Sequence, residues 1–195
     1  MKEILTHRIA ALLAEIERPG LLYEVYVGFF THNAPLPDAE NPKIKNPIRR
    51  AQWALGQEGK FFIQSSLKKS VLFSVSHSSF QDSSTVIVFG AAADPGLVGV
   101  GIDLERLDRE VSAGVAEKFI LSTEKNLPLL PIELFSLKEA AFKSNPKNQN
   151  TVISQYEVSP RANSSEIYEL KGPGLYQGVG AVFKIAGWAV AVALA

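Results

Sequence analysis

Hydrophobic positions at the start of the chain recur at helical spacing. They predict an amphipathic first helix, ended by Pro19-Gly20, and they are Ile4, Leu5, Ile9, Leu12, Leu13 and Ile16. The next run, LYEVYVGFF (22–30), is rich in aromatic and β-branched residues and predicts a strand. A loop rich in Pro and Asn is expected from Thr31 to Pro47, followed by a short helix around Trp53.

Further along the chain, strand-like runs surround a smaller number of helical patterns. Three strands are expected at 60–64 (KFFIQ), 71–77 and 84–91, and the turn at 93–96 follows them. Another strand is expected at 97–105, and a helix carries Val111, Val115 and Phe119. Pro131 suits the first turn of a helix that includes 133–143, because its missing N–H would have no partner there. The last strands are expected at 151–158, 165–170, 181–186 and 188–195.

The order of these elements predicts an α+β fold. Each half of the chain begins with helical patterns and continues with strands, so we expect two similar α+β lobes, at 1–95 and 96–195. No repeat is visible in the sequence itself. The pseudo-two-fold relation between the lobes therefore depends on the order of elements alone.

Composition narrows the classes of function. The chain has 195 residues, and Lys+Arg and Asp+Glu number 20 each, which argues against a nucleic-acid-binding surface. There is no cysteine, so disulfides, thiolate zinc sites and cysteine nucleophiles are excluded. The apolar runs are shorter than a membrane span, and charges interrupt the N-terminal segment as they do not in a signal peptide. A cytoplasmic protein is expected.

Two acidic residues, separated by one apolar residue, lie on the strand VGIDLE (100–105). Alternation along a strand turns Ile102 and Leu104 to one face and Asp103 and Glu105 to the other. Two carboxylates on one face repel each other unless they lie in open water or share a cation. Hard oxygen ligands of this kind suit Mg²⁺. The alternative is a solvated strand face that carries two acids.

The helix at 133–143 places charges beside an apolar arc. Lys138 falls within the arc formed by Leu134, Leu137 and their neighbours, and a lysine is rarely buried without a partner. It either extends to the surface along its alkyl stem or meets carboxylates or phosphates in a cleft. Glu139 and Lys143 are four residues apart, which also fits an ordinary surface ion pair.

The run FSVSHSS (73–79) contains a histidine among hydroxyl groups. Alternation turns His77 to one face of the strand and Ser74, Ser76 and Ser78 to the other. A serine-hydrolase triad is disfavoured because neighbours on one strand do not easily make the required contact, and no G-x-S-x-G elbow is present. His77 and Ser76 suit a phosphate or nucleotide contact, although a core histidine is an alternative.

In this order and spacing, three segments resemble the 4'-phosphopantetheinyl transferases of the type that activates surfactin and enterobactin synthetases. The segments are FSVSHS (73–78), VGVGIDLE (98–105) and FSLKEAAFK (135–143), and KFILSTEKNL (118–127) resembles the family's connecting stretch. The resemblance covers roughly residues 71–147. It departs from the family at Gly59-Lys60-Phe61, where Gly-Lys-Pro is usual, and at 144–150, where a glycine-containing loop is usual.

The resemblance implies a function and a set of roles. The family moves the 4'-phosphopantetheine of coenzyme A to a serine of an acyl or peptidyl carrier protein and releases 3',5'-ADP. By resemblance, Mg²⁺ is held by Asp103, Glu105 and Glu139, and Glu124 is an acid near the metal. The residues that meet phosphates or the nucleotide are then Lys143, Lys138, His77, Ser76, Arg49, Arg50 and Lys60.

The resemblance also implies an active site in the cleft between two lobes of one chain, so a monomer is expected. Either Glu139 or Glu124 would accept the proton of the carrier serine.

Two rival functions predict different experimental results. A catalytically weakened relative would bind coenzyme A or a carrier protein without turnover, and a serine hydrolase using Ser76 and His77 would cleave esters without a metal.

Overall fold

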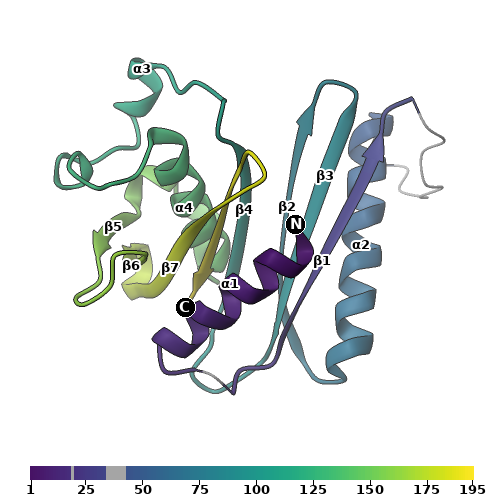
Figure 1. The fold of residues 1–195 in the computed structure, drawn as a ribbon, viewed down its shortest axis with the longest axis horizontal. Helices are drawn as coiled ribbons and strands as arrows, with labels where there is room; N and C mark the ends of the chain where they lie inside the picture. The colour runs from purple at the N-terminus through teal and green to yellow at the C-terminus, as the bar shows by residue number, and fades with distance from the viewer. Residues whose placement is uncertain (19, 34–42) are drawn as a thin grey trace.

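The structure, a computed structural model, describes residues 1–18, 20–33 and 43–195. This part of the chain is mixed α+β, with four α-helices and two antiparallel sheets. Figure 1 shows the sheets side by side, with helices on their outer faces and one helix across both. The expected α+β class is confirmed.

The first sheet has three strands in the order β1-β3-β2. They are β1 (Tyr23–Thr31), β2 (Val71–Phe80) and β3 (Ser83–Ala92). Helix α2 (Pro47–Leu67) packs on one face through Leu55 and Ile63, while helix α1 (Lys2–Glu15) packs on the other. Side chains alternate between the two faces of β3, so this strand contributes to both packing layers. Val86 and Val88 face α2, whereas Ile87 and Phe89 face α1.

The second sheet has five strands in the order β4-β8-β7-β6-β5. They are β4 (Val100–Arg106), β5 (Glu157–Pro160), β6 (Ile167–Gly172), β7 (Tyr176–Ile185) and β8 (Trp188–Leu194). Helix α4 (Pro131–Ser144) covers one face, and α1 lies against the other. The short helical segments are α3 (Ala113–Ala116), η1 (Ser122–Glu124), η2 (Asn148–Asn150), η3 (Ile153–Gln155) and η4 (Pro173–Leu175).

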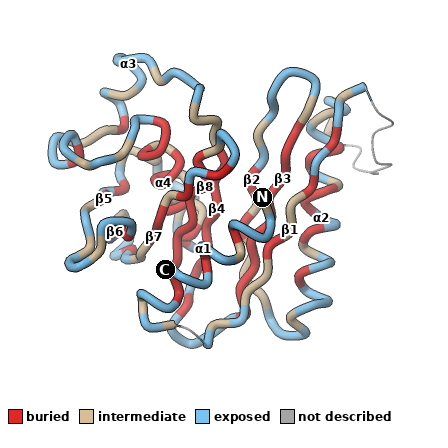
Figure 2. The backbone as a smooth tube through the Cα atoms, viewed as in Figure 1, coloured by how far each residue is buried: buried red, intermediate tan, exposed pale blue. Residues whose placement is uncertain are grey.

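One apolar core joins both sheets. Leu5, Ile9 and Leu13 of α1 pack with Phe89 of the first sheet and Ile102 of the second. Figure 2 shows that buried residues concentrate on the central strands beneath this helix. Helix α1 therefore holds the two sheets together.

The two sheets meet where β2 lies beside β4, and side chains make this junction. The backbone N–H of Ile102 donates to Ser74 Oγ at 2.9 Å, and that of Leu104 donates to Ser76 Oγ at 3.1 Å. Both serines are buried, as alternation along β2 predicts for one face of the strand. Serine hydroxyls thus take the place that backbone carbonyls hold inside a sheet.

The strand expected at 60–64 is wrong, because this segment continues α2. Phe61 and Phe62 are 76% and 43% exposed, whereas Ile63 is fully buried against the first sheet. The repeat Leu55, Gly59, Ile63 has a spacing of four, which is helical and outweighs the β-propensity of the aromatic pair. The Gly-Lys-Phe segment therefore forms no turn. A Cβ at Gly59 would lie 2.6 Å from the Tyr26 ring, so this glycine lets α2 approach the sheet.

The remaining expectations hold wholly, in part, or not at all. Pro131 is the first residue of α4, as predicted. The helix expected around Val111–Phe119 is reduced to α3, and the strand expected at 151–158 is replaced by η3 and the short β5. Pro19, expected to end the first helix, and most of the loop expected at 31–47 lie outside the described residues.

Candidate active site

Two glycines set the position of α4 on β4. A Cβ at Gly99 would lie 1.7 Å from the Ser144 carbonyl oxygen, and one at Gly101 would lie 1.8 Å from that of Ala140. Any side chain at either position would force the helix away from the strand. This close approach brings the end of α4, with Lys143, beside Asp103 of β4.

Asp103 and Lys143 form the centre of the site. Lys143 Nζ lies 2.7 Å from Asp103 Oδ1 and also donates to the Ile102 carbonyl at 3.2 Å. Ser76 donates to the same Asp103 oxygen at 3.0 Å. Asp103 Oδ2 is buried and has no hydrogen-bond partner in the described part of the chain. A buried carboxylate oxygen without a partner is costly, so this atom is available to a ligand.

The other two predicted acidic ligands lie within electrostatic range of Asp103. Burial raises the pKa of Glu139, and the negative charges of Asp103 and Glu105 add to this effect, while Lys143 opposes it. Burial also raises the pKa of Glu105, although its hydrogen bonds with Arg109 work against the shift. The three carboxylates therefore influence one another electrostatically.

The contacts of these acids differ from the expected ones. Arg109 donates to both oxygens of Glu105, at 2.8 and 2.7 Å. The surface ion pair considered for Glu139 and Lys143 is not formed, because Lys143 turns to Asp103 instead.

The three acids offer the kind of ligand atoms that Mg²⁺ prefers. All three candidate ligands offer carboxylate oxygens, which a hard cation prefers, and Asp103 Oδ2 lacks a partner. Among residues 1–18, 20–33 and 43–195, no three acidic or histidine side chains already stand close enough together to hold a metal ion. The chemistry of the donors fits, and the ammonium of Lys143 supplies the positive charge beside Asp103.

Lys138 and Glu124 form a separate buried ion pair, which corrects the roles expected for both. Their charged atoms are 2.7 Å apart and both side chains are fully buried. Lys138 also donates to the Phe119 carbonyl, while Glu124 accepts from the backbone N–H groups of Leu121 and Val158. With every partner internal, Lys138 does not meet a phosphate and Glu124 does not act as a base. The apolar arc around Lys138 indicated burial, and Glu124 is the partner that permits it.

Ser76 and His77 point to opposite sides of β2. Ser76 is 4% exposed and joins β2 to Asp103 and the Leu104 backbone, so its expected phosphate contact is corrected to a structural one. His77 is exposed and lines two cavities. Desolvation lowers its pKa, and the positive charges of Lys143 and Arg49 lower it further, which favours the neutral imidazole.

The first cavity beside His77 lies between α2 and β2 and has a volume of about 460 Å³. Arg49 and Lys60, two of the predicted nucleotide contacts, line it together with Trp53. Arg50, the third, does not line it. The second cavity, of about 560 Å³, lies on the β4 side of His77 and is lined by Glu105 and Arg109.

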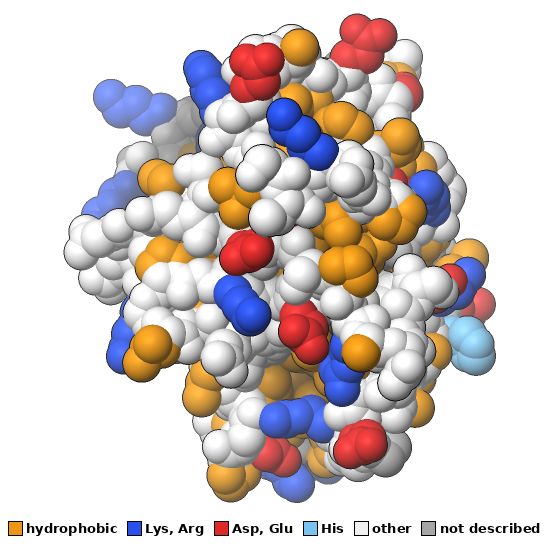
Figure 3. All heavy atoms as spheres, turned by 90° about the vertical axis from the view of Figure 1, so that its left-hand side faces the viewer, with side chains coloured by type: hydrophobic (Ala, Val, Ile, Leu, Met, Phe, Trp, Pro, Cys, Tyr) orange, Lys and Arg blue, Asp and Glu red, His pale blue; other side chains and the backbone are white. Residues whose placement is uncertain are grey.

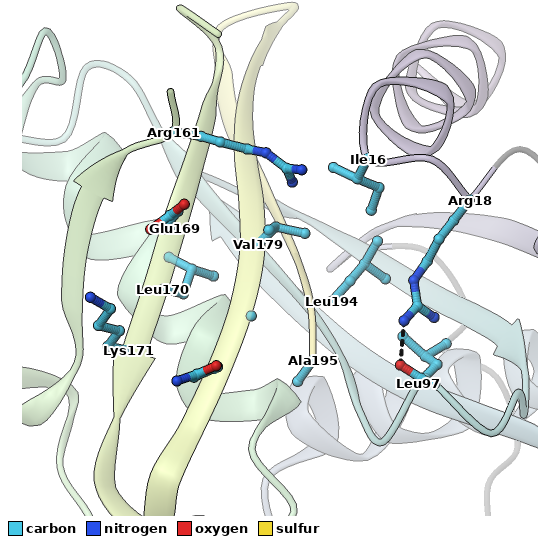
Figure 4. A pocket seen from close by; sticks show the side chains of 13 residues that line it. Ile16, Arg18, Leu97, Arg161, Glu169, Leu170, Lys171, Val179, Leu194 and Ala195 are labelled. Carbon is cyan, nitrogen blue, oxygen red and sulfur yellow. Dashed lines mark hydrogen bonds between the residues drawn. The ribbon is translucent and has the colours of Figure 1, made fainter. Parts of the chain in front are cut away.

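A larger cavity of about 620 Å³ lies elsewhere, between the end of α1 and strands β6 and β7. Figure 4 shows Arg161 reaching across it toward Ile16, and Arg18 bonded to the Gly96 carbonyl. None of the predicted site residues lines this cavity. Figure 3 shows the face that carries α3 and the β5–β6 end of the second sheet, where acidic and basic side chains are interspersed with apolar ones.

Sequence reasoning missed three kinds of site residue. Gly99 and Gly101 were detectable as glycines alternating on a strand ahead of an acid, which marks close approach of another backbone. Arg109 stands four residues after Glu105, and Trp53 stands four residues after Arg49 on a helix. The helical spacing puts Arg49 and Trp53 within reach of each other, whereas Arg109 reaches Glu105 only because the chain turns after β4. Neither spacing shows which residues face a cavity.

A comparison of the sequence with protein-family models and with curated proteins found no match to either. None of the helices in the described part of the chain is long and apolar enough to cross a membrane.

Proposed function

We propose that this protein is a magnesium-dependent 4'-phosphopantetheinyl transferase, built as a pair of similar α+β lobes with the active site at their junction. One observation carries the proposal. The carboxylates of Asp103, Glu105 and Glu139 interact beside the Lys143 ammonium at the β2–β4 junction, and His77 links this centre to a cavity with further cations. Carboxylates that can hold a divalent cation, next to positively charged side chains that can neutralise phosphate oxygens, suit the binding of a metal-bound pyrophosphate.

In the proposed reaction, the oxygen of a carrier serine attacks the β-phosphorus of coenzyme A. The bond between that phosphorus and the bridging oxygen breaks, and 3',5'-ADP leaves with the oxygen. Lys143 neutralises charge on the phosphate oxygens. Glu139, directly or through a metal-bound water, would accept the serine proton. Bound Mg²⁺, held by Asp103, Glu105 and Glu139, would supply Lewis-acid polarisation of the pyrophosphate.

The test is Mg²⁺-dependent modification of apo carrier proteins by coenzyme A, read as a mass gain equal to one phosphopantetheine. A panel of fatty-acid, polyketide and peptide-synthetase carriers is used. Asp103→Ala and Glu139→Ala should each lose at least about 100-fold in rate, which corresponds to about 2.7 kcal/mol of lost transition-state stabilisation. Glu3→Ala, which removes an exposed acid from α1, is the matched control. Unchanged rates in both site variants would refute this metal site.

A second candidate is a relative that binds coenzyme A without turnover. Arg109 favours it, because its two hydrogen bonds occupy both oxygens of Glu105. Calorimetry separates the two candidates: coenzyme A binding without a mass gain on any carrier supports the second. Arg109→Ala distinguishes them further, since freeing Glu105 should then restore transfer.

A further inference from the structure

The cavity of about 620 Å³ between the end of α1 and strands β6 and β7 has an apolar floor. Helix α1 ends at Glu15, and the floor lies beyond that end, on the face of the second sheet opposite α4. Leu97 and Leu194 are buried in this floor, and Val179 is half-buried. A hollow of this size lies within the range of sites that hold small organic ligands.

Three positively charged side chains from separate parts of the chain surround the floor. Arg18 follows α1, Arg161 lies between β5 and β6, and Lys171 belongs to β6. Figure 4 shows the Arg161 side chain extending over the cavity toward Ile16. Among the described residues that line the cavity, Glu169 provides the one acidic side chain. Positive side chains therefore outnumber negative ones around an apolar surface.

Two of these cations have no internal partner. Within the described part of the chain, neither Arg161 nor Lys171 makes an ion pair or a side-chain hydrogen bond. Arg161 is nevertheless half-buried, and a charged group withdrawn from water is costly unless acceptors face it. Arg18 donates to the Gly96 carbonyl, which uses only part of the five N–H donors of its guanidinium. The cavity thus offers several N–H donors to an anion.

An apolar floor beneath unpaired donors fits a ligand of mixed character. Inorganic phosphate would leave the floor wet, and a neutral apolar molecule would leave the cations without acceptors. The planar guanidinium suits the oxygens of a carboxylate, sulfonate or phosphate group. We propose that this cavity binds a small organic anion, with its charged group on Arg18 and Arg161 and its apolar body on the floor. None of the residues of the proposed transferase centre lines the cavity, so the inference does not depend on the proposed function.

The probe 8-anilinonaphthalene-1-sulfonate has both features, and its fluorescence reports apolar surroundings. It should bind the folded protein saturably, and Arg161→Glu should weaken that binding about 10- to 100-fold, because a charge-assisted hydrogen bond is lost and an acid faces the sulfonate. Lys171→Glu, at an exposed position, tests the same charge without a risk to folding. Glu169→Gln should strengthen binding. Lys125→Glu reverses an exposed charge outside the cavity and is the matched control.

Competition against the bound probe separates a site for organic anions from a merely apolar patch. Octanoate should displace the probe at concentrations at least about 10-fold lower than acetate or octanol, because only octanoate carries both a charge and an apolar chain. Octyl phosphate, compared with octanoate, shows which charged group the site prefers.

Three results would overturn the inference. One is equal affinity for the probe in the parent protein, Arg161→Glu and Lys171→Glu, with circular dichroism showing that all three are folded. Another is displacement by octanol as readily as by octanoate, which would reveal an apolar patch that ignores charge. The third is the absence of saturable probe binding to the folded parent protein at millimolar concentrations.

Discussion

The buried pair Lys138–Glu124 allows a quantitative prediction. Both side chains are fully buried and their charged atoms are 2.7 Å apart. Burial lowers the pKa of Lys138, and Glu124 opposes that shift. Lys138→Met would leave a buried carboxylate without its cation and remove the bond to the Phe119 carbonyl. Loss of one partner from a buried pair costs about 3–5 kcal/mol, so the free energy of unfolding should fall by that amount.

Urea denaturation at pH 7, followed by far-ultraviolet circular dichroism, measures this loss. The double variant Lys138→Met/Glu124→Gln removes both charges and should recover part of the stability, because no uncompensated charge remains. Lys2→Met is the matched control. Its pair with Glu24 is partly exposed, so the change should be below about 1 kcal/mol. A cost of Lys138→Met no larger than that of Lys2→Met would refute the reasoning.

Three further predictions follow from single contacts. Gly59→Ala should lower the free energy of unfolding by about 1–3 kcal/mol, because its Cβ would overlap a ring carbon and a methyl group of the first sheet; Gly114→Ala, with open space around it, should not. Ser76→Ala should cost about 1–3 kcal/mol by leaving the buried Leu104 N–H unpaired, measured in the same urea titration. Glu139→Gln should raise the melting temperature at pH 7. The raised pKa of Glu139 means that its ionised form costs stability above that pKa, so the gain should vanish as pH falls below the ordinary carboxylate range; a gain that persists at pH 3 would contradict this.

The secondary structure was predictable where the local sequence gave one clear signal. Strands such as β3 and β8 are continuous apolar runs, and Pro131 fixed the start of α4. The segment 60–64 was wrongly expected to be a strand, because Phe61 and Phe62 raise β-propensity although they point away from the sheet. The packing of Ile63 against the first sheet is what favours a helix over a strand at 60–64, and that packing is not visible in the local sequence.

The site was predictable in part for a related reason. Alternation along β4 gave the common face of Asp103 and Glu105, and helical spacing gave Glu139 and Lys143. Lys138 was recognised as unusual, but its partner Glu124 lies fourteen residues earlier in sequence, and no local pattern joins them. Whether a charged residue pairs internally or faces a cavity depends on tertiary packing, which one sequence does not contain.

The shared core beneath α1 has a consequence for how the molecule unfolds. Since Leu5 and Ile9 are packed by strands from both sheets, neither half retains its interior once the other melts. Denaturation should accordingly be one cooperative event. A polypeptide cut near residue 95 should regain structure only when both fragments are mixed.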